Sequence, residues 1–186
     1  MLEFHNVAVE PQPPYDAGLE QTTFSLGPGE LALVRVDEGA PHTPLGDVAQ
    51  GLVGLSDGKV LFEGRNWSGL NGDELVAARA RTGRVFEGAG WVSNLDVDEN
   101  IQLAQMCHTQ RTPDEIQADI MELAKAFEMD ELPRIRPAVT PRTVLRRAQW
   151  VRAFLSQPMM LVLERPTREM PDAWSDVLLK QVRASR

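Results

Sequence analysis

The chain has 186 residues, a formal net charge of −8 and 42% hydrophobic residues. This length suits about one domain with a substantial core. The negative charge argues against a surface that binds nucleic acid non-specifically. No apolar run approaches the roughly 20 residues of a membrane span. Acidic residues and prolines interrupt the N-terminal segment, so we expect a cytoplasmic protein without a signal peptide.

Cysteine and histidine show no pattern of a metal site. Cys107 is the single cysteine, which excludes a disulfide framework and a cysteine-based metal site. The histidines, His5, His42 and His108, are far apart and lack the spacing of zinc ligands. We therefore interpret each histidine as a surface residue or a hydrogen-bond partner.

The first third of the chain alternates predicted strands with turns and contains one helix. A Gly-Pro-Gly hairpin turn is predicted at 27–29, and apolar residues recur at helical spacing over 45–53, after a Gly/Pro loop. Strands are predicted at 2–9, 22–26, 31–36 and 59–63.

The rest of the chain is mainly helical. The pairs Asn71/Glu74, Asp96/Glu99 and Thr112/Glu115 have the spacing of helix capping boxes. Two short strands are predicted at 84–87 and 159–163, and the continuous apolar run of the second is typical of a buried parallel strand. Helices are predicted at 71–80, 101–107, from 113 to before Pro133, from 140 to 155, and at 172–182.

In order and spacing, these blocks resemble the nucleotide-binding domain of an ABC transporter. The resemblance covers nearly the whole chain. Residues 51–64 resemble the end of the P-loop helix with the next strand, and 83–87 resemble the strand that enters the Q-loop. Residues 95–104 are similar to the start of the helical subdomain, and 145–167 to the signature helix with the Walker B strand.

The resemblance implies a fold and a domain organisation. The fold is α/β, a P-loop NTPase-like mixed sheet with an N-terminal antiparallel β portion and a helical subdomain. We expect a single ABC ATPase-like domain over 1–186, with the helical subdomain at approximately 88–140. We also expect it to be C-terminally short, because the family's strand with a switch histidine is not reached before Arg186.

On this resemblance, the Walker A loop falls on residues 39–47, and Gly39 alone matches the family. Leu45 stands where the family has the lysine that contacts phosphate. Gly46 and Asp47 stand where the family has the hydroxyl that binds magnesium. The cationic and hydroxyl groups of a phosphate site are therefore replaced.

Three further features bear on nucleotide binding. Pro41 and Pro44 cannot donate the N–H groups that a phosphate nest needs. Asp47 places a negative charge at the helix N-terminus, where phosphate would otherwise be stabilised. Tyr15 lies roughly where the family has an aromatic residue that stacks on adenine, but a loop aromatic also packs locally.

The other chemical positions of the family are also replaced. Glu164 and Arg165 follow the Walker B strand, where the family has Asp for magnesium and Glu for the attacking water. Arg165 cannot act as a general base because its guanidinium stays protonated. Glu87 stands at the Q-loop glutamine and, like Glu164, can bind a metal. The signature falls on 140–144, where Arg142 can meet a phosphate or be solvated.

Three hypotheses follow. The first is a degenerate pseudo-ATPase, a structural or regulatory subunit beside a membrane permease, another part of a transport complex or a second ABC ATPase. It needs no catalytic residue and no cofactor, and it meets the inner membrane through its partner.

The second hypothesis is a weak ATP-binding or ATP-hydrolysing transporter subunit, with Mg²⁺ at Glu164 and Glu87 and phosphate at Arg142 or Arg165. The third is a soluble interaction module unrelated to transport. A homodimer and a heterodimer both stay open, and no nucleic-acid partner is expected.

The region from 134 to 152 is basic. Its six arginines suit an anionic partner surface or a solvated helix face with local ion pairs.

Overall fold

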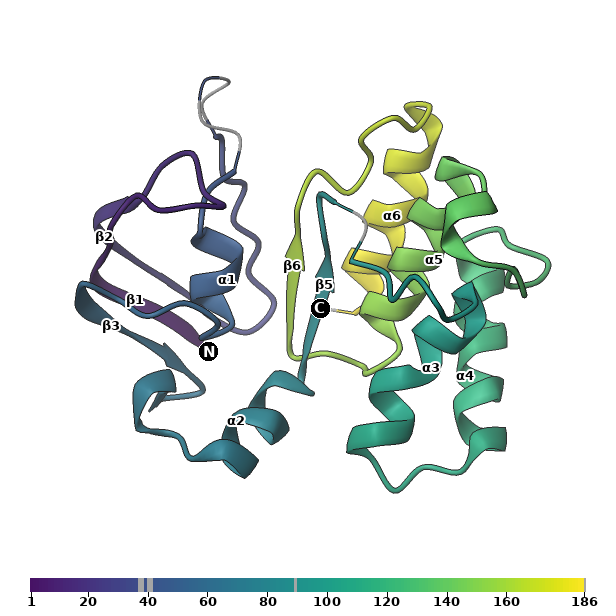
Figure 1. Cartoon of the computed structure of the whole chain (residues 1–186), viewed down its shortest axis with the longest axis horizontal. Helices are drawn as coiled ribbons and strands as arrows, with labels where there is room; N and C mark the ends of the chain where they lie inside the picture. Colours follow the sequence, from purple (N-terminus) through teal and green to yellow (C-terminus); the bar gives the residue numbers. More distant parts are fainter. Residues whose placement is uncertain (37–38, 40–41, 89, 186) are drawn as a thin grey trace. The chain divides into compact units, whose positions relative to one another are not determined.

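A computed structural model describes residues 1–36, 39, 42–88 and 90–185. The chain forms two compact units, Met1–Arg79 and Ala80–Ser185. Figure 1 shows the strands of the first unit and the helix-rich second unit. Within the described part of the chain, no helix combines the length and the apolar character that crossing a membrane requires.

The N-terminal unit is built on an antiparallel sheet with the strand order β2-β1-β3-β4. The inward side chains of β1 pack tightly, as when Phe4 stacks on Phe24 of β2 with ring centroids 4.4 Å apart. The predicted strands at 2–9, 22–26 and 59–63 are therefore confirmed. The elements of this unit are β1 (Leu2–Val9), β2 (Leu19–Leu26), α1 (Leu45–Ala49), β3 (Asp57–Phe62), β4 (Arg65–Asn66), the 3-10 helix η1 (Trp67–Gly69) and α2 (Gly72–Arg79).

The predicted strand at 31–36 is wrong. These residues have no regular secondary structure, and Leu33 is 91% exposed. An apolar run becomes a strand only where a neighbouring backbone accepts and donates its hydrogen bonds. Here β1 pairs with β2 on one edge and with β3 on the other. Residues 31–36 do not pair with the outer edge of β2, which is an edge strand, so the turn at 27–29 does not close a hairpin. Gly27 N donates to the carboxylate of Glu30.

Helix α1 is shorter than the predicted span of 45–53. It ends at Ala49, and Gly51 follows with a φ of 62°. A Cβ atom on Gly51 would lie 2.5 Å from Cγ of Trp67. The indole N–H of Trp67 donates to the carbonyl oxygen of Ala49 at 3.2 Å. The helix stops because the chain turns sharply against Trp67, which leaves Leu52 half exposed.

The C-terminal unit contains a parallel pair of strands, β5 (Thr82–Val85) and β6 (Met160–Leu163). The register pairs Thr82 with Met160 and Val85 with Leu163, which confirms the predicted parallel strand. Burial is less complete than we predicted, because only Met160 of β6 is fully buried. The helices of the unit are α3 (Val97–His108), α4 (Pro113–Ala126), the 3-10 helix η2 (Pro137–Val139), α5 (Arg142–Phe154) and α6 (Ala173–Ala184).

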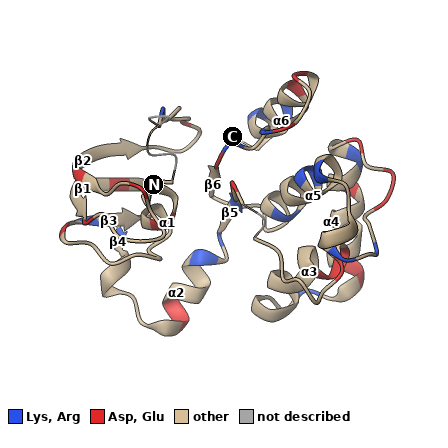
Figure 2. Ribbon diagram, turned by 45° about the horizontal axis from the view of Figure 1, so that its top comes forward, with Lys and Arg blue, Asp and Glu red and all other residues tan. Residues whose placement is uncertain are grey.

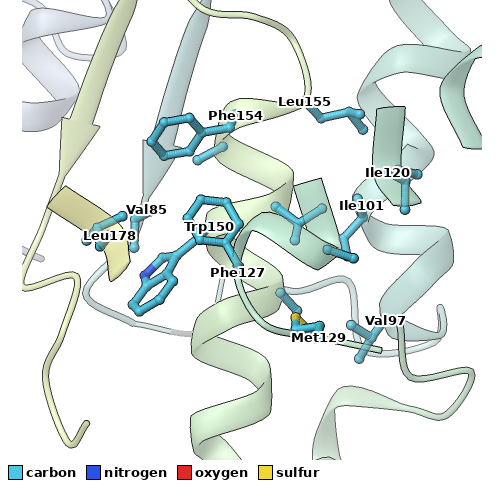
Figure 3. Close-up of a cluster of buried hydrophobic side chains, with 14 of the residues drawn as sticks. Val85, Val97, Ile101, Ile120, Phe127, Met129, Trp150, Phe154, Leu155 and Leu178 are labelled. Atoms are coloured by element: carbon cyan, nitrogen blue, oxygen red, sulfur yellow. The ribbon is translucent and has the colours of Figure 1, made fainter. Parts of the chain in front are cut away.

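The core of the C-terminal unit gathers around Trp150 of α5 (Figure 3). Trp150 is fully buried and meets Phe127 edge to face, with ring centroids 5.5 Å apart. Helix α5 also approaches β5 closely, since a Cβ on Gly83 would lie 2.0 Å from the carbonyl oxygen of Ala153. The capping boxes predicted for α3 and α4 are both present. Local caps and one aromatic core thus fix the helices beside β5 and β6.

Candidate nucleotide site

The first set of site residues lies in the N-terminal unit, at the start of α1. Leu45, Gly46 and Asp47 form its first turn. The hydroxyl of Tyr15 donates to Oδ2 of Asp47 at 2.7 Å, so the predicted adenine-stacking residue and the predicted magnesium position lie together. Gly39 lies in a turn. Pro41 falls outside the described residues.

His42 connects the same segment to the loop between β1 and β2, which contains Tyr15 and Asp16. Its backbone N–H and its ring Nδ1 both lie 2.9 Å from Oδ2 of Asp16, and Asp16 N donates to the carbonyl oxygen of His42 at 2.9 Å. The backbone hydrogen bond is the main reason that the pKa of the Asp16 carboxyl is lowered below its ordinary value. The sequence analysis named His42 only as a residue without ligand spacing. Its structural partner, Asp16, was not predicted.

The second set of site residues lies in the C-terminal unit, where β5 and β6 end. Arg84 of β5 forms a two-pronged ion pair with Glu164, which directly follows β6. Nε of Arg84 lies 3.1 Å from Oε2 and Nη2 lies 2.7 Å from Oε1. The side chain of Arg84 is 7% exposed and that of Glu164 is 26% exposed. The guanidinium of Arg84 thus binds the carboxylate of Glu164, which is the predicted Mg²⁺ ligand of the second hypothesis.

Sequence reasoning missed Arg84. The signal was present, because an arginine within a short β-rich segment bounded by glycines must find a partner when the segment is buried. Its guanidinium also lies over the ring of Phe86, 4.6 Å from the centroid, which is a cation–π contact.

Glu87, at the predicted Q-loop position, is also bound by arginines. Its Oε1 accepts from Nη1 of Arg165 at 2.9 Å and from Nη1 of Arg168 at 2.6 Å. Arg146 of α5 donates to the backbone oxygens of Phe86 and Glu87, at 2.9 and 3.4 Å. The structure therefore brings the predicted residues Glu87 and Arg165 together and adds Arg168, which the sequence analysis did not single out.

Arg142 is the first residue of α5, and its side chain is 83% exposed. Its Nη1 donates to Oε2 of Glu169 at 2.9 Å, and this hydrogen bond is the main cause that lowers the pKa of Glu169. Helix α5 has no side-chain cap and no acidic residue in its first turn, unlike α3 and α4. Arg142 is thus accessible to solvent at the positive end of a helix.

These contacts limit the chemistry of the site. A carboxylate that binds a guanidinium through both oxygens has fewer lone pairs left for a metal ion. Within the described ranges, no group of three or more histidine, cysteine, aspartate or glutamate side chains is placed to hold a metal ion. The carboxylates of Glu87 and Glu164 are thus both held in ion pairs with arginines.

Several known proteins are similar to this chain in sequence. No family model matches the chain. It is 26% identical to the phosphonates import ATP-binding protein PhnC of Alcaligenes faecalis over 193 residues, which cover 98% of this chain and 68% of PhnC. It is 23% identical to the cell division ATP-binding protein FtsE of Escherichia coli over 162 residues, 87% of this chain and 72% of FtsE.

Solved structures of ATP-binding cassettes have a similar fold. The ATP-binding cassette MJ0796, in a dimeric post-hydrolysis state bound to ADP and Pi, matches with a TM-score of 0.84 and 19% identity, over 98% of this chain and 83% of MJ0796. The chain is similar in sequence to ATP-binding proteins, and its fold is that of an ATP-binding cassette. The predicted resemblance and the predicted mixed α/β cassette fold are therefore confirmed. The chain spans 72% of the length of FtsE and 35% of the length of a putative ABC transporter ATP-binding protein of Mycoplasma pneumoniae.

Proposed function

We propose that this cassette is a subunit of an ABC transport complex that does not hydrolyse ATP and has a structural or regulatory role. The observation that carries the proposal is the ion pairing at the ends of β5 and β6. Arg84 binds Glu164, and Arg165 with Arg168 binds Glu87. Hydrolysis needs a carboxylate that holds Mg²⁺ and a group that orients water. Here each carboxylate already has a cationic partner.

Arg165 strengthens the argument. It directly follows Glu164, at the position where the cassette family has the glutamate for the attacking water. A guanidinium cannot accept a proton near neutral pH. Its side chain is 40% exposed and pairs with Glu87, so in this proposal Arg165 is an ion-pair partner of the loop rather than a catalytic group.

The partners belong to the same proposal. The relatives are named as import and cell-division ATP-binding proteins, and the MJ0796 cassette is described as dimeric. We propose a membrane permease or a second cassette as the partner, and a cytoplasmic location at the inner membrane through that partner. In this proposal residues 1–186 form one cassette, with α3 and α4 in a helical subdomain at approximately 88–140.

A second candidate function is a weak ATP-binding subunit. The observation that favours it is the relatives themselves, since proteins matched over most of this chain are named for ATP binding. In this case Glu164 and Glu87 would hold Mg²⁺, and Arg142 or Arg165 would contact phosphate. Arg84 and Arg168 would then have to release their carboxylates. Tyr15 could stack on adenine only by giving up its hydrogen bond to Asp47.

A nucleotide titration of the full chain separates the two functions. We expect no phosphate release above a protein-free control, and no Mg²⁺-dependent heat in calorimetry with millimolar ATP. Even a weak site of about −4 kcal/mol would register at that concentration. Phosphate release that disappears in Glu164→Gln would contradict the proposal. Magnesium-dependent heat without turnover, lost in Glu164→Gln, would support the second candidate instead.

A further inference from the structure

A pocket of the C-terminal unit lies outside all the predicted nucleotide positions. Its volume is about 640 Å³. Small-molecule sites typically have volumes of about 300–1,000 Å³ and contain a few fixed polar groups. The walls come from α3, α4 and the segment between them, from the residues just before β5, and from the segment after α5. None of the described residues in these walls is a predicted site residue.

Gln105 of α3 brings a nearly buried donor to this pocket. The residue is 6% exposed and lines the pocket. Its Oε1 accepts from Nη1 of Arg111 at 3.3 Å. Because a guanidinium has donors only, this contact fixes the amide oxygen toward Arg111 and leaves Nε2 for another acceptor. The residues that the structure describes provide no acceptor for Nε2. A buried donor without an acceptor is costly, so an oxygen atom of a ligand would be stabilised here.

Arg111 joins Gln105 to a carboxylate of α4. Its Nη2 donates to Oδ2 of Asp119 at 2.6 Å and to the carbonyl oxygen of Glu115 at 3.1 Å. The side chains of Arg111 and Asp119 are 28% and 31% exposed. This contact uses Oδ2 of Asp119, so the lone pairs of Oδ1 can accept from a cationic group. An amide donor and a carboxylate acceptor thus lie on the two sides of one guanidinium.

Both signs of charge meet at this pocket. Elsewhere in the C-terminal unit they lie on different elements, with mainly acidic residues on α4 and arginines along α5 (Figure 2). Arg81 and Arg111 line the pocket together with Glu115 and Asp119, so two positive and two negative side chains balance each other. A ligand with one charge of each sign matches such a pocket better than a multiply charged anion or cation does.

We infer that this pocket binds a small zwitterion, an amino acid or short peptide with a free ammonium and a free carboxylate. The carboxylate accepts from Nε2 of Gln105 and from the hydroxyl of Ser156, and the ammonium donates to Oδ1 of Asp119. Ala118 and Leu155 give the ligand apolar contact. The inference goes beyond the proposed function, because it uses none of the residues on which that function depends.

Calorimetry of the full chain with the dipeptide L-alanyl-L-alanine tests the class of ligand. We expect a dissociation constant of about 1 mM or lower. Acetylation of the dipeptide removes its ammonium and amidation removes its carboxylate, so each blocked form should bind at least tenfold more weakly. Absence of heat with about 10 mM dipeptide, or equal affinity for the blocked forms, would overturn the inference.

The variant Gln105→Glu tests the donor. It keeps an oxygen atom toward Arg111 and replaces Nε2 by a second oxygen, which repels the carboxylate of the ligand. We expect dipeptide binding to weaken at least tenfold. Gln102→Glu is the matched control, because it adds the same charge to α3 at a residue that does not line the pocket. Circular dichroism checks that both variants fold. If folded Gln105→Glu binds the dipeptide as tightly as the control does, the inference is wrong.

The variant Asp119→Asn tests the acceptor. It keeps an oxygen atom for Arg111 but removes the charge that binds the ammonium. The ratio between the affinities for the dipeptide and for its acetylated form should therefore fall from at least tenfold to about one. Glu122→Gln removes one negative charge at an exposed position of α4 outside the pocket and should keep the ratio. An unchanged ratio in folded Asp119→Asn, or an equal fall in the control, would contradict the inference. The nucleotide titration reports on the proposed function separately, since these variants leave Glu87 and Glu164 unmodified.

Discussion

Two regions of the chain contain the predicted nucleotide-site residues, and these residues differ in their chemistry and contacts. At the start of α1, the predicted phosphate and magnesium positions hold Leu45, which has no charge, and Asp47, which is negative. At the ends of β5 and β6, the carboxylates Glu164 and Glu87 are present but are bound by arginines. A phosphate site at the start of α1 would need new residues. A metal site at the ends of β5 and β6 would need only the removal of the arginines that bind the carboxylates.

The two regions also differ in what stabilises them. The start of α1 is fixed by the hydrogen bond from the Tyr15 hydroxyl to the Asp47 carboxylate and by the backbone hydrogen bond from Val48 to Pro44. The end of β5 is fixed by a nearly buried ion pair, in which removal of one member leaves a desolvated charge. Removal of Arg84 should therefore cost more stability than substitutions elsewhere in the chain that leave no desolvated charge.

The largest effect is expected for Arg84→Leu. The variant leaves Glu164 without its cation, and breaking a buried pair costs about 3–5 kcal/mol, so we expect about 2–3 for this partly exposed carboxylate. The free energy of unfolding from urea titration measures the loss. The double variant Arg84→Leu/Glu164→Leu should regain most of it, because no unpaired charge remains. A double variant as unstable as the single one would show that the ion pair is not the cause.

A smaller effect, about 2 kcal/mol, is expected for Gly51→Ala in the N-terminal unit. Gly51 has a φ of 62°, which L-residues disfavour by about 1–2 kcal/mol, and the new Cβ would overlap Trp67. Gly54→Ala is the matched control, because nothing lies within 4 Å of its Cβ position. Thermal unfolding of both variants measures the difference. Equal melting temperatures would mean that Trp67 does not restrict the end of α1.

The smallest effect is expected at the cap of α4. Thr112→Ala should cost about 1 kcal/mol, because the Thr112 hydroxyl accepts from the backbone N–H of Glu115. Urea titration at neutral pH measures this. A decrease in the free energy of unfolding that is smaller than the experimental error would contradict the role of the capping box. Ser at position 112 retains the hydroxyl and should behave like the unmodified chain.

The same cap makes the stability of the folded chain depend on pH. Hydrogen bonds from Thr112, first from its backbone N–H, lower the pKa of Glu115 below its ordinary value. A lowered pKa means that the folded state favours the carboxylate. Its contribution to stability is therefore full above the unfolded pKa and is lost as the pH falls through the folded one. Glu115→Ala should thus destabilise the chain at neutral pH and progressively less in acid.

The sequence by itself determined much of the local helical structure and the resemblance to an ATP-binding cassette. The capping boxes of α3 and α4 were predictable because residues three positions apart bind each other in any helix. The buried face of α4, with Ile116 and Ile120, follows from helical periodicity. The order of the blocks indicated a cassette. These features depend on neighbours along the chain, which the sequence lists directly.

The tertiary structure decided which groups are available for chemistry. Arg84 and Glu164 are 80 residues apart, and Glu87 and Arg168 are 81 apart, so only the parallel pairing of β5 with β6 brings them together. The fold also left residues 31–36 outside the sheet and ended α1 at Trp67. Pairing across such distances depends on sheet register and on packing space, and neither is encoded in the spacing of residues along one segment.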